Sequence, residues 1–180
     1  KKAGRRVFAT RALPKKIAPV ADVAPILRGL LAIPVNPAER EWKRLVLDFR
    51  ASPAILSFVN GRDLGRYGLA GTATPDHVIR TKQKPLIAPA PEIGKSEAFK
   101  AGVQKALDKY IAEYRAYFAR NNKRFDGKKK EIDPIPRVVL VPGLGLFGLG
   151  ESKKAAAIAA DLAETNVEVI ANAETLGRFK

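Results

Sequence analysis

The chain has no cysteine and no methionine among its 180 residues, and it has a single histidine. Without cysteine, disulfides, thiolate metal ligands and cysteine nucleophiles are excluded, and a reducing cytoplasmic location is the simplest expectation. One histidine falls short of the usual zinc ligand sets, so we expect no metal site and no bound cofactor in this chain. No residue is assigned a catalytic role on these grounds.

Long apolar runs are also missing. No stretch approaches the roughly 18 residues that a membrane-spanning helix needs, and the basic start is not followed by a signal-type apolar core. We therefore expect no membrane partner. Because the numbering begins at Lys1 and no methionine occurs, we expect a fragment of a longer protein.

Positive charge is abundant, with a formal net charge of +15. It gathers in two segments, residues 1–16 and 120–130. Lysines and arginines of this density can neutralise nucleic-acid phosphates. However, no zinc finger or aromatic-basic motif accompanies them, which disfavours a nucleic-acid partner. Two solvated basic segments facing an acidic partner domain are the preferred interpretation, with a basic nucleic-acid-binding module kept as the alternative.

Residues 1–40 read as a basic, proline-containing linker or arm, which includes a short helix from Asp22 to Leu31 with Asp22 as its cap. Residues 41–180 read as a single α/β domain. Strands are predicted at residues 44–49, 86–88 and 138–141, and helices at 52–61 and 96–122, the latter two capped by Ser52 and Ser96. This alternation predicts a three-layer α/β/α fold with a mainly parallel sheet, Rossmann-like or flavodoxin-like.

The central stretch combines a short apolar run, Val138–Val141, with four glycines and a helical pattern. Gly143, Gly145 and Gly148 match G-x-G-x-x-G, and Gly150 follows. Such glycines suit a loop that approaches either a phosphate or a neighbouring element closely. A phosphate loop and a tight turn without a ligand remain equal alternatives.

A dinucleotide site would need a second strand after this helix, followed by an acidic residue such as Glu174. The segment 167–170 could form that strand. Apolar residues nevertheless continue at helical spacing through it, as Ala155, Ile158, Ala159, Leu162, Val169, Ala173 and Leu176. We therefore expect one long helix, which disfavours the dinucleotide interpretation.

The segment 71–86 has the highest concentration of side chains that could bind a ligand. We predict a phosphate or anion site formed by Asp76, His77, Arg80, Thr81 and Lys82, because a guanidinium beside hydroxyls suits such oxygens. A strand at Val78–Ile79 would place His77 and Thr81 on one face and Arg80 and Lys82 on the other. The alternative is a structural turn in which His77 bonds to a carbonyl and Arg80 pairs with Asp76. We expect this segment to meet residues 143–150 at the ends of strands.

Helix 96–122 carries an apolar and aromatic stripe: Phe99, Val103, Ala106, Leu107, Tyr110, Tyr114, Tyr117 and Phe118. Such stripes are typical of a core or of a subunit interface. This leaves a structural spacer that mediates homo-oligomerisation as a further alternative function.

Two segments resemble a known family. Gly71–Lys82 (GTATPDHVIRTK) and Pro136–Gly148 (PRVVLVPGLGLFG), together with Ala173–Phe179 near the end, resemble the bifunctional rhamnulose-1-phosphate aldolase/alcohol dehydrogenase type. This type joins a class II aldolase/adducin half to a short-chain dehydrogenase half. The resemblance covers about residues 40–180 and corresponds to the middle region of such a protein.

The resemblance implies that the parent cleaves a ketose 1-phosphate to dihydroxyacetone phosphate and an aldehyde. A nicotinamide-dependent dehydrogenase would then oxidise or reduce the aldehyde. It also implies zinc and NAD in the parent, and the remaining aldolase and dehydrogenase domains as partners. The paired histidine motif and the dehydrogenase Tyr-x-x-x-Lys of the family are both absent here. We therefore do not expect this chain to be catalytic by itself.

Overall fold

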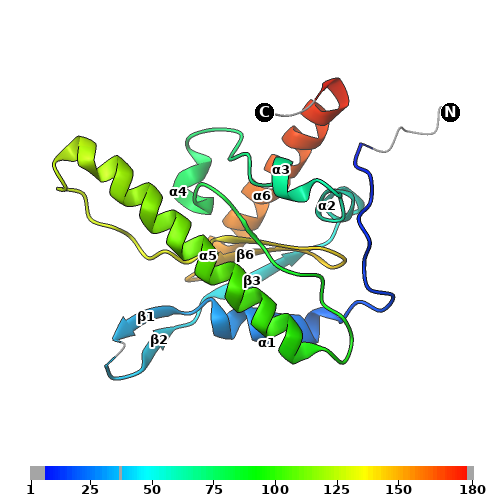
Figure 1. Cartoon of the computed structure of the whole chain (residues 1–180), viewed down its shortest axis with the longest axis horizontal. Helices are drawn as coiled ribbons and strands as arrows, with labels where there is room; N and C mark the ends of the chain where they lie inside the picture. Colours follow the sequence, from blue (N-terminus) through cyan, green and yellow to red (C-terminus); the bar gives the residue numbers. More distant parts are fainter. Residues whose placement is uncertain (1–6, 37, 178–180) are drawn as a thin grey trace.

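A computed structural model describes residues 7–36 and 38–177. It contains short helices around a small sheet and two long helices, one in the middle of the chain and one at its end (Figure 1). In chain order these elements are α1 (Val20–Leu30), β1 (Ile33–Asn36), β2 (Glu41–Lys43), β3 (Val46–Arg50), α2 (Pro53–Val59), α3 (Leu64–Tyr67), α4 (His77–Thr81), β4 (Leu86–Ile87), α5 (Ser96–Asn122), η1 (Lys123–Phe125), β5 (Val138–Val141), β6 (Gly145–Gly150) and α6 (Lys153–Leu176).

The main sheet has four strands in the order β3-β6-β5-β4. Only β4 and β5 are parallel, whereas β5 pairs with β6 and β6 with β3 in antiparallel register. The mixed α/β class is confirmed, but the predicted mainly parallel sheet is wrong, and Rossmann-like and flavodoxin-like sheets are built from parallel strands. The reason lies in residues 142–144, which make a tight turn closed by a bond from the Leu144 amide to the Val141 carbonyl, 3.0 Å.

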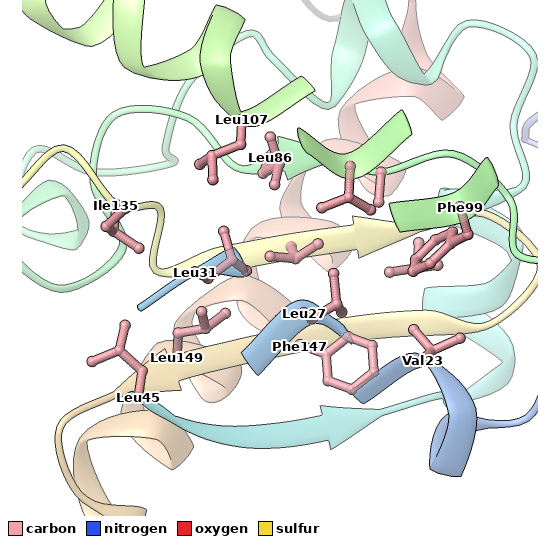
Figure 2. Packing of buried hydrophobic residues seen from close by; sticks show 14 of the residues in the cluster. Val23, Leu27, Leu31, Leu45, Leu86, Phe99, Leu107, Ile135, Phe147 and Leu149 are labelled. Carbon is pink, nitrogen blue, oxygen red and sulfur yellow. The ribbon is translucent and has the colours of Figure 1, made fainter. Parts of the chain in front are cut away.

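Helices cover both faces of this sheet. On one face, side chains of α1 and α5 pack with Val139, Phe147 and Leu149 in a hydrophobic cluster (Figure 2). On the other, α2 and α6 pack with Val138, Leu140 and Leu146. Successive side chains of a strand point to opposite faces, so each of the buried strands supplies both clusters.

Segments within residues 7–36 contribute to the body of the domain. Helix α1 buries Val23 and Leu27 beneath the sheet, and Phe8 packs against the rings of Phe58 and Tyr67. The strands β1 and β2 form a separate antiparallel hairpin that projects from the body (Figure 1). Trp42 on this hairpin is 54% exposed.

Two of the predicted helix caps differ in the structure. Ser52 caps α2 as predicted, accepting a hydrogen bond from the Ile55 amide at 3.3 Å. Helix α1 instead begins after Pro19, which leaves Asp22 inside the first turn, and α5 begins at Ser96 without a side-chain cap. Asp22 and Ser96 were wrongly predicted as caps because neighbouring turns extend both helices by one or more residues.

The predicted single helix at the end of the chain is confirmed as α6. Its buried face, however, consists mainly of small residues: Ala156, Ala159, Ala160, Ala163, Val167 and Ile170. Of the predicted stripe only Ala159 is fully buried, and Leu176 is 93% exposed. The larger side chains of the helix therefore did not identify its buried face. The helix lies so close to the glycines of β6 that mainly small side chains fit between them. None of the helices in the described ranges is both long and apolar enough to cross a membrane.

Candidate functional site

The segment with the predicted anion-binding residues forms a short helix. The prediction of a strand at Val78–Ile79 is wrong, because amides of residues 77–79 bond to carbonyls of residues 74–76 and so begin the helical turn of α4. The helix places Thr81 and Lys82 inside the protein and leaves Asp76 and Arg80 exposed.

A small cavity of about 30 Å³ brings three of the five predicted residues together. His77, Thr81 and Lys82 line it, facing Val138 and Leu140 of β5 and residues of α6. Asp76, Arg80 and the glycine segment 143–150 do not line it. A cavity of this size has room for a water molecule and is too small for a phosphate.

The alternative prediction was a structural turn in which Arg80 pairs with Asp76 and His77 bonds to a carbonyl. The structure does not contain the Arg80–Asp76 pair of that turn. The exposed Asp76 and Arg80 make no ion pair with one another, and within the described part of the chain no hydrogen-bond partner reaches the buried Nδ1 of His77. The Thr81 hydroxyl donates to the His77 carbonyl at 2.9 Å, which ties the end of the short helix to its beginning.

Lys82 has the least usual environment of the segment. Its backbone angles are φ 63° and ψ 178°, a region that only glycine adopts without strain. The residue is 5% exposed, and its Nζ donates to the Asp133 carbonyl and lies 4.5 Å from the centroid of the Tyr114 ring. The Lys82 side chain thus contacts both the loop before β5, through Asp133, and helix α5, through Tyr114.

Burial lowers the pKa of Lys82 to about 8. The Asp133 carboxylate raises this pKa, the Arg137 guanidinium lowers it and Glu131 raises it, but desolvation dominates. Asp133 and Arg137 pair with each other at 2.6 Å, so much of the acidic charge near Lys82 is already neutralised. Near neutral pH a measurable fraction of this amine is therefore uncharged.

Residues of the loop before β5 and of α5 complete the environment of Lys82, and sequence reasoning missed them. They are Tyr114, Glu131, Asp133 and Arg137. Glu131 carries a buried oxygen, Oε1, that lacks a hydrogen-bond partner among the described residues. The i, i+4 spacing of Asp133 and Arg137, with Pro134 and Pro136 between them, was the one available signal, since it favours a local ion pair that shapes a loop.

The four glycines lie in the β5–β6 hairpin and pack against protein. Gly143 lies in the turn at φ +84°, and the other three belong to the central strand β6. A Cβ on Gly148 would lie 2.5 Å from the Ala156 carbonyl oxygen, and one on Gly150 would lie 2.3 Å from the Ala156 amide nitrogen. The glycine spacing allowed a close approach of the backbone either to a phosphate or to a neighbouring element. In the structure, β6 closely approaches a neighbouring element, the helix α6.

The residues present do not fit a zinc ion. In residues 7–36 and 38–177 there is no group of three or more histidine, cysteine, aspartate or glutamate side chains that could hold a metal.

Comparisons with known proteins agree with the resemblance at the family level. Residues 18–180 match the family described as aldolase class II, second domain. The chain is also 29% identical over 161 residues to the uncharacterized oxidoreductase YuxG of Bacillus subtilis (strain 168); the match covers 89% of this chain and 22% of that relative. No solved structure matches. Since the family match covers nearly all of the sequence, the chain belongs to the family of class II aldolase second domains.

Proposed function

We propose that this chain is the second domain of a bifunctional protein that couples a class II aldolase to a short-chain dehydrogenase. The parent would cleave a ketose 1-phosphate to dihydroxyacetone phosphate and an aldehyde, and would oxidise or reduce that aldehyde with NAD. The family match carries this proposal. A relative named an oxidoreductase, of which this chain spans only about a fifth, supports the presence of a second activity in a longer chain.

In this proposal the domain is not catalytic alone and contributes a contact to the substrate phosphate. Arg80 is the best candidate for that contact, because it is exposed on α4 and makes no ion pair with Asp76. Guanidinium groups bind phosphate oxygens through two parallel hydrogen bonds. Lys82 and Thr81 hold the segment in place from inside, through the Asp133 carbonyl and the His77 carbonyl.

The test uses the full-length parent protein. Ketose 1-phosphate cleavage is followed through release of dihydroxyacetone phosphate, and aldehyde turnover through NADH absorbance. We expect both activities in one polypeptide, and we expect Arg80→Ala to raise the KM for the ketose phosphate about tenfold or more while NADH-linked turnover of the free aldehyde is unchanged.

Arg124→Ala is the matched control, because Arg124 is an exposed arginine on η1, away from α4. A parent with only one of the two activities would refute the bifunctional assignment. Equal effects of Arg80→Ala and Arg124→Ala would refute the role of Arg80 and leave the assignment untouched.

A further inference from the structure

The second half of α5 borders a cavity that is large enough for a small organic ligand. The cavity measures about 340 Å³ and lies between α5 and the segment 83–84 that leads into β4. We call it the tyrosine groove and define it by Lys84, Tyr110, Glu113, Tyr114, Tyr117 and Arg120. Ligand sites usually have volumes of about 300–1,000 Å³, with aromatic walls and a few polar groups, and this cavity meets both criteria.

Two cations at the groove have no acidic partner among the residues that the structure describes. In the ranges that the structure describes, neither Lys84 nor Arg120 forms an ion pair with a carboxylate. Glu113, the acid at this site, pairs instead with Lys109, at 3.8 Å. The Arg120 guanidinium lies 6.0 Å from the centroid of the Tyr117 ring, and both side chains line the groove. A ligand anion would meet both charges without displacing a protein carboxylate.

The tyrosines are held in place from behind. The Tyr110 hydroxyl donates to the Lys84 carbonyl at 3.2 Å, which joins the two sides of the groove. Lys82 lies under the Tyr114 ring and fixes its position. Burial raises the pKa of Tyr110 and of Tyr114, so both remain protonated, and the Tyr114 hydroxyl can donate to a ligand across the neutral range.

We infer that the tyrosine groove binds a small phosphate monoester, with Lys84 and Arg120 on the phosphate and the tyrosines on the organic part. Tyrosine faces pack against C–H groups, and the Glu113 carboxylate can accept a hydrogen bond from a ligand hydroxyl. The preference for a sugar or triose phosphate rests on the proposed function, whereas the two cations that favour an anion belong to the groove itself, which Arg80 does not line.

The test is a calorimetric titration of this chain with dihydroxyacetone phosphate, inorganic phosphate and unphosphorylated dihydroxyacetone. We expect the phosphate ester to bind more tightly than inorganic phosphate, and dihydroxyacetone not to bind measurably. Arg120→Gln should weaken binding of the ester about tenfold to hundredfold, because a charge-assisted contact is lost. Tyr117→Ala should weaken the ester more than it weakens inorganic phosphate.

Arg124→Gln is the matched control, since it removes the same charge from η1 outside the groove and should leave the affinity within about twofold. Equal losses in Arg120→Gln and Arg124→Gln, or equal binding of dihydroxyacetone and its phosphate, would overturn the inference. Failure of this titration leaves the two activities of the parent unaffected. Conversely, if the parent proved to have no aldolase activity, the groove could still bind phosphate esters, and the titration would still detect it.

Discussion

Two regions of this domain differ in whether glycine occupies the positions where the local structure favours it. Where β6 meets α6, glycine stands at each position where a side chain would collide with helix backbone. At the end of α4 the backbone adopts a conformation suited to glycine, yet the residue is Lys82. In the first region the residue fits its conformation, and in the second the side chain must compensate for strain of about 1–3 kcal/mol. The comparison indicates that β6 and α6 pack closely because glycine fits there, whereas at Lys82 the contacts of the amine must offset the backbone strain.

The largest expected effect comes from adding a methyl group between β6 and α6. Gly148→Ala would place its Cβ 2.5 Å from two backbone atoms of α6, so the helix must move. We expect a loss of about 3 kcal/mol in the free energy of unfolding, measured by urea denaturation. Gly29→Ala is the control, because nothing lies within 4 Å of a Cβ there and a glycine in helix α1 is replaced. It should stabilise by about 0.5 kcal/mol. Similar effects of the two substitutions would contradict close packing at β6.

The next effect is on pH dependence and tests the environment of Lys82. Its pKa is about 8 in the folded protein and 10.5 in the unfolded chain, so between these values the unfolded chain binds more protons. Stability should therefore rise by about 2 kcal/mol from pH 8 to pH 10. Above about pH 10 the tyrosines oppose this, because burial raises the pKa of Tyr67 and Tyr110 and the unfolded tyrosines ionise first.

Lys82→Met provides the comparison for this measurement. Urea denaturation at each pH should show the rise between pH 8 and pH 10 in the wild type and no rise in the variant, whose stability falls slightly as the unfolded tyrosines begin to ionise. The same slope in both proteins would assign the titration to another group.

A smaller effect separates the strain at Lys82 from its contacts. Lys82→Ala and Lys82→Gly both remove the amine from the Asp133 carbonyl and from the Tyr114 ring. Only glycine relieves the backbone at φ 63°, so Lys82→Gly should be more stable than Lys82→Ala by about 1 kcal/mol, in spite of the usual entropic cost of glycine. Thermal denaturation of the pair measures the difference. An alanine variant as stable as the glycine variant would show that this backbone is not strained.

The smallest effect concerns the start of α6 beside the glycine strand. The Ser152 hydroxyl accepts a hydrogen bond from the Ala155 amide at 3.1 Å, so Ser152→Ala should cost about 1 kcal/mol. Ser96→Ala makes a matched control, because α5 begins at Ser96 without a side-chain cap. Differential scanning calorimetry of both variants should show a lower melting temperature for Ser152→Ala alone. An equal shift in both would mean that Ser96 also acts as a cap.

Local signals in the sequence predicted most of the elements but not how they pair. Pro53 after Ser52 marked the start of α2, and helical spacing across residues 153–176 marked α6. The strand at Val138–Val141 was also predicted. The glycines after it were assigned to a loop because G-x-G-x-x-G does not distinguish a loop from a strand packed closely against a helix.

The site was less predictable than the fold. Five residues in the segment 76–82 were predicted to form one site. In the structure His77, Thr81 and Lys82 line the same cavity, whereas Asp76 and Arg80 lie outside it. Tyr114, Glu131 and Asp133 are 32 to 51 residues from Lys82 in the chain, and no local pattern connects them to it. Their approach depends on how α5 crosses the sheet.

Composition, local periodicity and motifs were enough to predict the mixed α/β class, the two long helices α5 and α6, the basic charge and the class II aldolase family. The antiparallel β5–β6 hairpin, the glycine packing against α6, the burial of Lys82 and the tyrosine groove could not be predicted without the folded structure. Each of these is a contact between segments far apart in the chain. Such contacts depend on which surfaces exclude water together, and a local pattern of residues does not specify that.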